Sequence, residues 1–553
     1  MPTLVCVPIM VDDFEEAASD ARLARDLGAD LVEYRLDRAF EGLDDEHAIR
    51  SIETLIARSP LPCIATCRPT WEGGEYDGDD DERISLYERL GLAETPPGYV
   101  DIELAALTRS ANLRQKVRLA VDHARQRKDL STSLVLSVHD FEGRPADLSR
   151  KLIALQEEDA ARVIKVAYRA RTIRDNLELL ELPHETQRPT IALGMGEFGL
   201  MSRVLAPKFG GFLTFAALVG GKGTAPGQPT IAELNELYRF RSIAPSTKVY
   251  GVVGWPVGHS LSPMVHNAGF EARGHDGVYL PMPIPTAETT AGDDELSSAA
   301  AFKATLLELI DHPTLDLAGL SVTLPHKQRL VALARAQGWS SDKISQMSGS
   351  ANTVAIDRSG GGIAVSVTNT DSLAAVECLR DQIGAIAGKR IAIIGAGGVA
   401  RAIAFGLAAE GASLVIANRT IDNARALAEA INALGPVAAT PRELDQLDGS
   451  SLDAIVNATP VGMQGGPDPD GLPIAAPVLD SLRAGTAVFE TVYSPLETPL
   501  VRASRERKLA VIDGATMFVR QAAEQFQRWT GARPPIGLFD RIVRERLEQS
   551  ASD

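Results

Sequence analysis

A lysine inside an apolar run is the first residue whose position suggests chemistry. Residues 163–168 read Val-Ile-Lys-Val-Ala-Tyr, a pattern typical of a strand buried on both faces, with Lys165 in its middle. Burial beside other cations favours the neutral amine, which can attack a ketone to form a Schiff base. An interior cation paired with Glu33 or Asp101 is an equally acceptable interpretation of this lysine alone. His139, at the end of the preceding predicted strand, is a candidate general acid and base.

Other charged side chains also follow predicted strands in the first 240 residues. They are Glu33, Arg35, Asp37, Arg68, Glu72, Glu75, Asp140, Glu197 and Arg203. In a barrel of alternating strands and helices, the carboxyl ends of the strands converge on one mouth, where functional residues gather. Arginine binds a carboxylate through two parallel hydrogen bonds. The pattern therefore predicts a charged pocket around Lys165, suited to an acidic ketone.

Eight short apolar runs separated by amphipathic stretches must position these residues. The predicted strands are Leu4–Met10, Leu31–Leu36, Cys63–Cys67, Tyr99–Leu104, Leu134–Val138, Val163–Tyr168, Thr190–Gly194 and Phe212–Leu218. Eight such units predict a closed parallel (β/α)8 barrel over residues 1–241. Residues 242–248, Ser-Ile-Ala-Pro-Ser-Thr-Lys, have no apolar period and are predicted to be a linker.

Six ordered motifs in this region resemble the type I 3-dehydroquinate dehydratase family. They are Glu33-Tyr34-Arg35, Thr66-Cys67-Arg68 with Glu72-Gly73-Gly74-Glu75, Ser137-Val138-His139-Asp140-Phe141, Val163-Ile164-Lys165, Gly199-Leu200-Met201-Ser202-Arg203 and Ala225-Pro226-Gly227-Gln228. The resemblance implies that Lys165 forms an iminium with the substrate ketone, that His139 shuttles protons, and that Glu72 positions or charges His139. It also implies a set of substrate-binding residues, namely Glu33, Arg35, Arg68, Arg203, Thr224 and Gln228. Thr224 stands where this family commonly has serine, and it keeps the hydroxyl.

A glycine-rich stretch in the second half is typical of dinucleotide binding. Residues 390–402 contain Gly395, Gly397 and Ala400 in a G-x-G-x-x-A arrangement, between a predicted strand and a predicted helix. The intervening Ala396, Gly398 and Val399 belong to the same predicted loop. The next strand ends in Asn418, Arg419 and Thr420, so an arginine occupies the place of the acid that NAD enzymes present to the ribose. The cofactor predicted is NADP(H) rather than NAD(H).

Polar residues between the barrel and this motif could bind a small substrate. Ser260 and Ser262 precede a predicted helix, where either could simply cap it. Thr323 and Lys327 follow a predicted strand, and Lys327 alone could be a solvated surface lysine. Asp371, farther along the chain, follows another predicted strand. A lysine held by an aspartate could stabilise and protonate the alkoxide that forms when a ketone accepts hydride.

These stretches resemble the shikimate dehydrogenase family across residues 248–532. The resemblance implies a catalytic pair, Lys327 and Asp371. It implies a substrate-binding set of Ser260, Ser262, Thr323, Asn352, Tyr493 and Gln521. It adds Thr459 and Gly514 to the cofactor-binding residues. Val367-Thr368 replaces the family's usual Gly-Tyr, and Asn423 stands where a second basic residue is common.

The fold class predicted is therefore α/β: the barrel, an α/β substrate domain over residues 248–370 completed by helices in 515–553, and a Rossmann-like NADP-binding domain over 371–514. The order of the two families resembles bifunctional fusions known in plants. The function predicted is dehydration of 3-dehydroquinate followed by NADPH-dependent reduction of 3-dehydroshikimate to shikimate. Two alternatives are a second half that acts on quinate, and a sensor that binds these ligands without catalysis.

Composition restricts the partners. Hydrophobic residues make up 45% and charged residues 23% of the 553 residues, as in globular chains, and the formal net charge of −17 argues against nucleic acid. No run of about 20 apolar residues predicts a membrane span, so a cytoplasmic location is expected. The spacing of the four cysteines suggests neither a disulfide framework nor a metal site. The partners expected are small-molecule substrates, and the sequence gives no oligomeric state.

Overall fold

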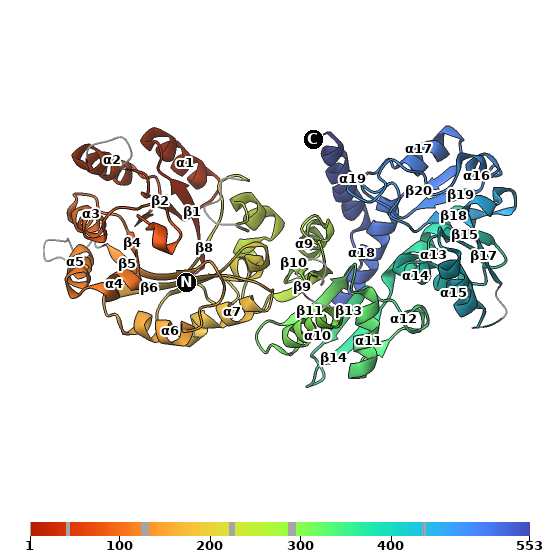
Figure 1. Cartoon of the computed structure of the whole chain (residues 1–553), viewed down its shortest axis with the longest axis horizontal. Coiled ribbons are helices and arrows are strands. Elements are labelled where there is room, and N and C mark those ends of the chain that lie inside the picture. Colours follow the sequence, from red (N-terminus) through yellow and green to blue (C-terminus); the bar gives the residue numbers. More distant parts are fainter. Residues whose placement is uncertain are drawn as a thin grey trace. The chain divides into compact units, whose positions relative to one another are not determined.

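The protein divides into two compact units, Met1–Thr247 and Lys248–Asp553. The structure is a computed structural model that describes residues 2–39, 45–122, 132–220, 227–285, 295–433, 435 and 438–552. Figure 1 shows strands enclosed by helices in the first unit and two further sheets in the second. The division falls inside the segment predicted as a linker, residues 242–248.

The first unit is built around one parallel sheet of eight strands in the order β7-β6-β5-β4-β3-β2-β1-β8. Its strands are β1 (Leu4–Met10), β2 (Leu31–Arg35), β3 (Cys63–Thr66), β4 (Tyr99–Glu103), β5 (Ser133–Asp140), β6 (Ala161–Arg169), β7 (Thr190–Met195) and β8 (Leu213–Phe215). The predicted barrel is confirmed, because each apolar run forms a strand and consecutive strands lie side by side.

Helices follow most of these strands. They are α1 (Phe14–Asp26), α2 (Asp45–Ala57), α3 (Asp80–Leu92), α4 (Leu104–Arg109), α5 (Ala111–Asp122), α6 (Leu148–Glu157), α7 (Asp175–Glu185) and α8 (Leu200–Val204). Local sequence sets several of their starts. The Asp13 carboxylate, for example, accepts hydrogen bonds from the backbone N–H groups of Glu15 and Glu16 at the start of α1.

The barrel is nearly closed, and the contact between β8 and β7 differs from the contacts between its other neighbouring strands. β8 forms its ladder with β1, where Leu4 pairs with Leu213, but the described residues show no ladder between β8 and β7. One backbone hydrogen bond of 2.8 Å, from the Phe212 N–H to the Thr190 carbonyl, links the two sides. β8 has only three residues, which leaves few backbone groups to form a second ladder.

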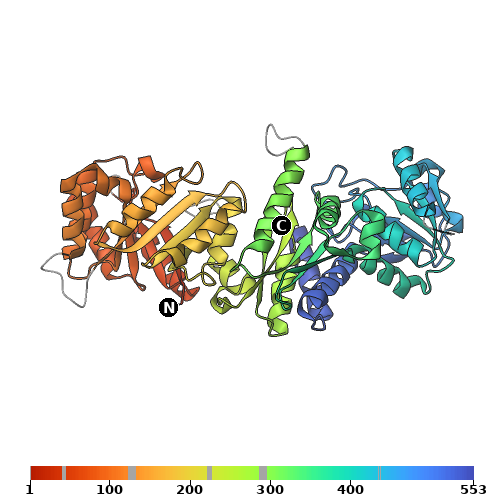
Figure 2. The same ribbon diagram turned by 90° about the horizontal axis from the view of Figure 1, so that it is seen from below.

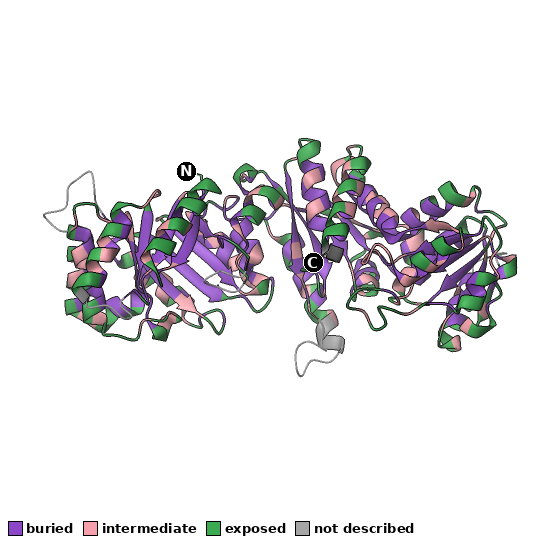
Figure 3. Ribbon diagram, turned by 90° about the horizontal axis from the view of Figure 1, so that it is seen from above, coloured by how far each residue is buried: buried purple, intermediate pink, exposed green. Residues whose placement is uncertain are grey.

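Alternation along β6 turns Lys165 toward the barrel interior. Val163 and Ala167 belong to the interior apolar cluster, together with Cys6, Ile64 and other inward-facing residues. Side chains two positions apart in a strand share a face, so Lys165 lies on the interior face between Val163 and Ala167. Figure 3 shows the barrel strands as buried, whereas the surrounding helices carry exposed faces.

The second unit begins with a six-stranded mixed sheet in the order β10-β9-β11-β13-β14-β12. Its strands are β9 (Lys248–Gly254), β10 (Gly277–Pro283), β11 (Leu317–Val322), β12 (Ser340–Ser341), β13 (Thr353–Asp357) and β14 (Ala364–Thr368), and its helices are α9 (Ser262–Ala272), α10 (Glu295–Asp311), α11 (Lys327–Gln337) and α12 (Lys343–Ser348). β13 pairs antiparallel with both β11 and β14. This pairing brings the residues before β13 and after β14 to the same edge.

A parallel six-stranded sheet follows, in the order β17-β16-β15-β18-β19-β20. Its strands are β15 (Arg390–Ile394), β16 (Ser413–Ala417), β17 (Ala439–Arg442), β18 (Ala454–Asn457), β19 (Ala487–Glu490) and β20 (Ala510–Ile512), and its helices are α13 (Thr370–Ile383), α14 (Gly398–Ala409), α15 (Ile421–Asn432), α16 (Ala476–Asp480) and α17 (Pro499–Glu506). Ile391 and Ile393 enter one apolar core, whereas Ala392 and Ile394 enter another. Helices therefore cover both faces, as predicted for a doubly wound sheet.

The last two helices return to the first sheet of the second unit. α18 (Gly514–Thr530) and α19 (Ile536–Ser552) pack against each other and against α9, and α18 also contacts β13. Figure 2 shows these blue helices beside the green elements of that sheet. Phe518, Phe526 and Phe539 join Tyr250 and Val265 in one apolar core. Within the described residues, no helix combines the length and apolar character that crossing a bilayer requires.

Candidate active sites

A cavity at the carboxyl ends of the barrel strands collects most of the predicted residues of the first unit. Its lining consists of Glu33, Arg35, Arg68, Glu72, Gly73, His139, Phe141, Lys165, Ala167, Leu193, Met195, Arg203, Phe215 and Gln228. Thr224 lies outside the described residues. The lining combines apolar side chains with charged ones, a combination that suits a small anion with a ring.

Lys165 is held by two carboxylates. Its Nζ lies 2.8 Å from Asp101 Oδ2 and 3.7 Å from Glu33 Oε1, and it lies 4.7 Å from the centre of the Phe215 ring. The Thr66 hydroxyl donates to Glu33 Oε1 at 2.8 Å. Burial alone would raise the pKa of Asp101, but Arg68 and Lys165 hold that pKa well below its usual range. Lys165 is therefore half of an ion pair, in agreement with one of the two interpretations of its sequence position.

His139 and Glu72 form a second pair at the mouth. Glu72 Oε1 accepts the backbone N–H of His139 at 2.8 Å and lies 3.1 Å from Nδ1 of the same residue. Burial, helped by the nearby cations Arg68 and Lys165, lowers the pKa of His139 well below its usual range. Burial also raises the pKa of Glu72 to about 7. The imidazole is consequently neutral at physiological pH and can accept a proton.

The three arginines of the cavity differ in their partners. Arg35 lies 2.6 Å from the buried carboxylate of Asp37. Arg68 pairs with Asp101 and Glu103. Arg203 donates to the Gly194 carbonyl at 3.1 Å, and burial lowers the pKa of its guanidinium to about 10.

No carboxylate pairs with Arg203 among the described residues, so its charge is available to an anionic ligand. Gln228 Oε1 is also buried and has no hydrogen-bond partner in the described part of the chain. Both groups line the cavity. A ligand with a carboxylate and hydroxyl groups would satisfy them together.

In the second unit, Lys327 and Asp371 meet directly. Lys327 is the first residue of α11 and Asp371 lies in the first turn of α13, and Lys327 Nζ lies 2.7 Å from Asp371 Oδ2. The Asn369 side chain caps α13 by accepting the backbone N–H of Ser372 at 3.0 Å. The two helix starts therefore bring together residues that are 44 positions apart in the sequence.

Asn352 and Gln521 lie beside this pair. Asn352 Oδ1 accepts the backbone N–H of Thr370, the residue before Asp371, at 2.8 Å. Its Nδ2 lies 3.3 Å from Gln521 Oε1. Because a backbone N–H can only donate, this contact fixes which side of the Asn352 amide carries the oxygen. The Nδ2 group is consequently directed toward Gln521 as a donor.

The remaining predicted substrate residues belong to turns and helix starts around the first sheet. Ser260 Oγ accepts the backbone N–H of Ser262 at 3.3 Å, so it supports the start of α9. Thr323 follows β11 and packs so closely on Gly254 that a Cβ there would lie 2.3 Å from Thr323 Cγ2. Tyr493 packs on Phe518 of α18, with ring centres 5.1 Å apart.

The predicted cofactor residues gather at the carboxyl edge of the parallel sheet. β15 pairs with β16 and β18, so the loop 395–400 lies beside Asn418, Arg419 and Thr420 on one side and Thr459 on the other. Gly514 opens α18 after β20 at the same edge. The structure thus brings together glycine, hydroxyl and arginine groups that are separated along the chain.

The backbone of this loop fits a dinucleotide. Gly395 has φ = 112°, and a Cβ there would lie 2.8 Å from the Ala458 carbonyl oxygen, so glycine is required. A Cβ on Gly397 would meet nothing within 4 Å, which leaves open space at the start of α14. Backbone N–H groups at such a helix start attract a pyrophosphate. The exposed Arg419 supplies a cation suited to a 2′-phosphate.

Sequence analysis did not identify Glu490 or Glu103. Glu490 is buried at the end of β19, where its Oε1 accepts the Asn457 side-chain amide and the Val492 N–H, both at 2.9 Å. Burial raises the pKa of Glu490 to about 7. Glu103 is buried and forms an ion pair with Arg68. Only the position of each acid at a strand end hinted at a role.

Together these features define a two-part α/β enzyme, with a lysine-containing barrel followed by a dinucleotide-binding dehydrogenase. Family models agree with both parts. The model "Type I 3-dehydroquinase" matches residues 5–245. The models for the shikimate dehydrogenase substrate binding domain, for shikimate / quinate 5-dehydrogenase and for the shikimate 5'-dehydrogenase C-terminal domain match residues 252–354, 377–460 and 514–544.

Curated relatives extend this agreement over the whole chain. The bifunctional 3-dehydroquinate dehydratase/shikimate dehydrogenase of Arabidopsis thaliana, described as chloroplastic, is 36% identical over 98% of this chain and 84% of its own length. The NADP(+) shikimate dehydrogenase of Methanocella arvoryzae is 35% identical over 54% of this chain and 99% of its own length. A solved dehydroquinate dehydratase and shikimate dehydrogenase from S. pombe is 23% identical to this chain, with a TM-score of 0.43 over 98% of each chain.

The chain belongs to the family of bifunctional 3-dehydroquinate dehydratase/shikimate dehydrogenases. The bifunctional prediction is confirmed, and it is supported over the quinate enzyme and the ligand sensor.

Proposed function

We propose that the barrel dehydrates 3-dehydroquinate through a Schiff base on Lys165, and that the second unit reduces the resulting 3-dehydroshikimate to shikimate with NADPH. In this assignment residues 248–370 and 515–553 bind the substrate and residues 371–514 bind NADP(H). The observation that carries the proposal is the single cavity lined by Lys165, His139 and three arginines.

In the first reaction, the Lys165 ammonium gives one proton to the neutral His139, and the free amine attacks the ketone carbon. The former ketone oxygen takes one proton from the nitrogen and one from His139 and leaves as water, which produces the iminium and restores neutral His139. The positive nitrogen acidifies the adjacent C–H bond. The neutral His139 removes that proton, and the electron pair then expels the neighbouring hydroxyl, which His139 protonates as it departs. Water finally hydrolyses the iminium and releases the lysine amine.

The contacts of His139 support its role as the base. Glu72 Oε1 already accepts the backbone N–H, and a proton on Nδ1 can donate to the same carboxylate oxygen. Nε2 is then the unprotonated nitrogen and can receive the substrate proton. Glu72 would position the ring in this state. Arg35, Arg203 and Gln228 would bind the substrate carboxylate and hydroxyls, with Glu33 and Arg68 as further contacts.

In the second reaction, bound NADPH supplies hydride to the ketone carbon. Lys327 would stabilise the oxygen as charge develops and then donate it a proton, while the Asp371 carboxylate 2.7 Å away keeps the lysine charged and in place. Asn352 and Gln521 would orient the ring, and Ser260, Ser262, Thr323 and Tyr493 would surround the carboxylate and hydroxyls. Thr459 and Gly514 would contact the cofactor beside the glycine loop.

The decisive test mixes purified protein with 3-dehydroquinate and NADPH and follows shikimate and nicotinamide absorbance together. Shikimate formed at the expense of NADPH is expected. Sodium borohydride added with 3-dehydroquinate should leave a stable mass adduct on Lys165, and an unmodified Lys165 during turnover would exclude the Schiff base. We also propose a cytoplasmic location, which cell fractionation would test.

A further inference from the structure

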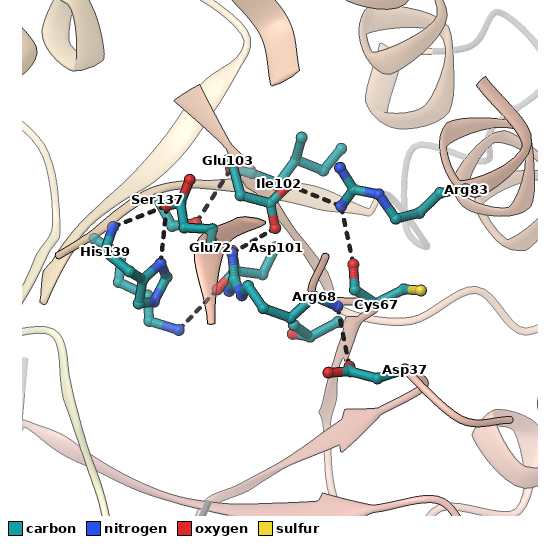
Figure 4. A network of polar contacts seen from close by, with 12 residues as sticks. Asp37, Cys67, Arg68, Glu72, Arg83, Asp101, Ile102, Glu103, Ser137 and His139 are labelled. Carbon is teal, nitrogen blue, oxygen red and sulfur yellow. Dashed lines mark hydrogen bonds and ion pairs between the residues drawn. The ribbon is translucent and has the colours of Figure 1, made fainter. Parts of the chain in front are cut away.

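A chain of buried ion pairs lies behind the barrel cavity (Figure 4). The member of this chain of ion pairs farthest from the cavity is Arg83 of α3, whose side chain has no solvent exposure. Arg83 Nη1 lies 2.7 Å from Glu103 Oε2 and donates to the Cys67 carbonyl at 2.9 Å, while Nη2 lies 2.9 Å from Asp80 Oδ1. Arg83 is not part of the cavity lining. It can influence the reaction only through the residues that it holds.

The next members connect Arg83 to the proposed nucleophile. Glu103 Oε1 lies 2.6 Å from Arg68 Nη1, and Arg68 Nη2 lies 2.8 Å from Asp101 Oδ1. Asp101 Oδ2 then lies 2.8 Å from Lys165 Nζ. Cations and carboxylates alternate along this chain, and each of the two acids gives one oxygen to each neighbour. All these side chains are at most 7% exposed.

We propose that Arg83 is a positioning residue of the dehydratase, which holds Arg68 and Lys165 in place through Glu103 and Asp101. The inference rests on the proposed function of the barrel, because it assigns Arg68 and Lys165 to the substrate. A buried carboxylate needs a partner for each oxygen, and among the described residues Arg83 is the cation paired with Glu103 Oε2. This arrangement makes the place of Arg68 depend on Arg83.

Loss of Arg83 would redistribute these contacts. Both oxygens of Glu103 would then compete for the Arg68 guanidinium and draw it away from Asp101. Asp101 would be left with Lys165 as its main counter-ion and would hold the ammonium more strongly. Arg68 would be misplaced for the substrate, and Lys165 would be held at Asp101 rather than directed at the substrate carbonyl. Substrate binding and iminium formation should therefore weaken together.

The test compares Arg83→Met with Arg83→Lys and with a matched control on the same helix, Arg89→Met. Arg89 also forms ion pairs with glutamates, at 2.7 Å from Glu46 and 3.3 Å from Glu53. These three residues are not members of the chain of ion pairs that leads to Lys165. We expect Arg83→Met to raise KM for 3-dehydroquinate about tenfold and to lower kcat by about the same factor. Arg83→Lys should recover most of both losses, because it restores a cation beside Glu103. Arg89→Met should behave as wild type.

Shikimate oxidation with NADP⁺, measured on the same samples, reports the folding of the second unit and the protein concentration. Borohydride trapping counts the barrels that are competent to react. Wild-type kcat and KM per competent barrel in Arg83→Met would overturn the positioning role. A wild-type protein without any dehydratase activity would instead reject the proposed function itself.

If Arg83→Met fails to fold, Glu103→Gln tests the same link. It keeps the size of the side chain but removes the charge that joins Arg83 to Arg68. A KM for 3-dehydroquinate raised severalfold is expected, and an unchanged KM and kcat would overturn the proposal.

Discussion

Lys165 and Lys327 are each paired with a buried aspartate, but they are held by different kinds of structure. Lys165 lies in the middle of β6, inside the barrel, with two carboxylates within 3.7 Å. Lys327 begins α11 at the edge of a sheet, and Asp371, at 2.7 Å, is the one carboxylate paired with it in the described part of the chain. Neighbouring strands fix the first lysine from both sides, whereas two helix starts bring the second lysine to its partner.

The difference matches the chemistry proposed for each lysine. A nucleophile that forms a covalent bond must approach one carbon along one direction, and a strand interior provides that rigidity. A lysine that donates a proton must above all stay charged, and one close carboxylate at a helix start is sufficient. In the proposed mechanism, the same pair of residue types serves either purpose according to the element that carries the lysine.

The largest expected effect is that replacement of Lys165 removes one of the two activities and leaves the other unchanged. Lys165→Ala should lower dehydratase turnover by about 10⁴-fold or more, because the covalent route is lost. Shikimate oxidation by the same protein should be unchanged. Steady-state assays of both activities on one preparation measure this. A dehydratase that keeps most of its rate would mean that the barrel does not act through Lys165.

Lys327→Ala should have the converse effect. Shikimate oxidation should fall by about 10²- to 10⁴-fold, the range for loss of a general acid or base. NADP⁺ affinity, measured by fluorescence titration, should stay close to wild type, because the residues proposed to bind the cofactor lie at the edge of the other sheet. Dehydratase activity serves as the control. Weak cofactor binding with normal turnover at saturation would contradict the catalytic role of Lys327.

Glu72 and Glu490 extend the comparison to buried acids, since burial raises the pKa of each to about 7. The folded pKa of Glu490 exceeds its ordinary value of 4.5, so the stability that it contributes is complete below pH 4.5 and is lost as pH rises toward 7. The loss amounts to at most about 3 kcal/mol. Glu490→Gln cannot lose a proton. Its unfolding free energy relative to wild type should therefore increase between pH 5 and pH 8.

Denaturant unfolding at several pH values measures this difference. Glu72→Gln provides the matched variant in the barrel and should leave the second unit unaffected. A difference between Glu490→Gln and wild type that is constant over this pH range would show that Glu490 does not titrate there.

The smallest effect concerns the anion sites of the two units. The barrel cavity is lined by the buried Arg68 and Arg203, whereas Arg419 of the proposed cofactor site is exposed and solvent weakens its contribution. Arg419→Ser should raise KM for NADP⁺ about tenfold and leave KM for NAD⁺ nearly unchanged. The ratio of the two kcat/KM values measures the preference. An unaltered ratio would assign the recognition of the 2′-phosphate to other residues.

Local signals in the sequence predicted most of the strands. The eight apolar runs of the barrel match its observed strands within a few residues, because period and length are properties of each segment. β12 and β17 of the second unit carry no such signal. β12 has two residues, and β17 contains Pro441 and Arg442, so neither has an apolar pattern. Their pairing with β14 and β16 stabilises them in the folded protein.

The sequence by itself determined the order of elements, the glycine loop at Gly395 and the residue types available at the strand ends. Only the tertiary structure decided which charges meet. Arg83, Arg68 and Lys165 come from separate segments, Asp101 and Glu103 share β4, and the ion pairs among them depend on strand order and register. The physical reason is the distance along the chain over which each effect acts. Backbone preferences act over a few residues, whereas a buried charge finds its partner only after distant segments have packed together.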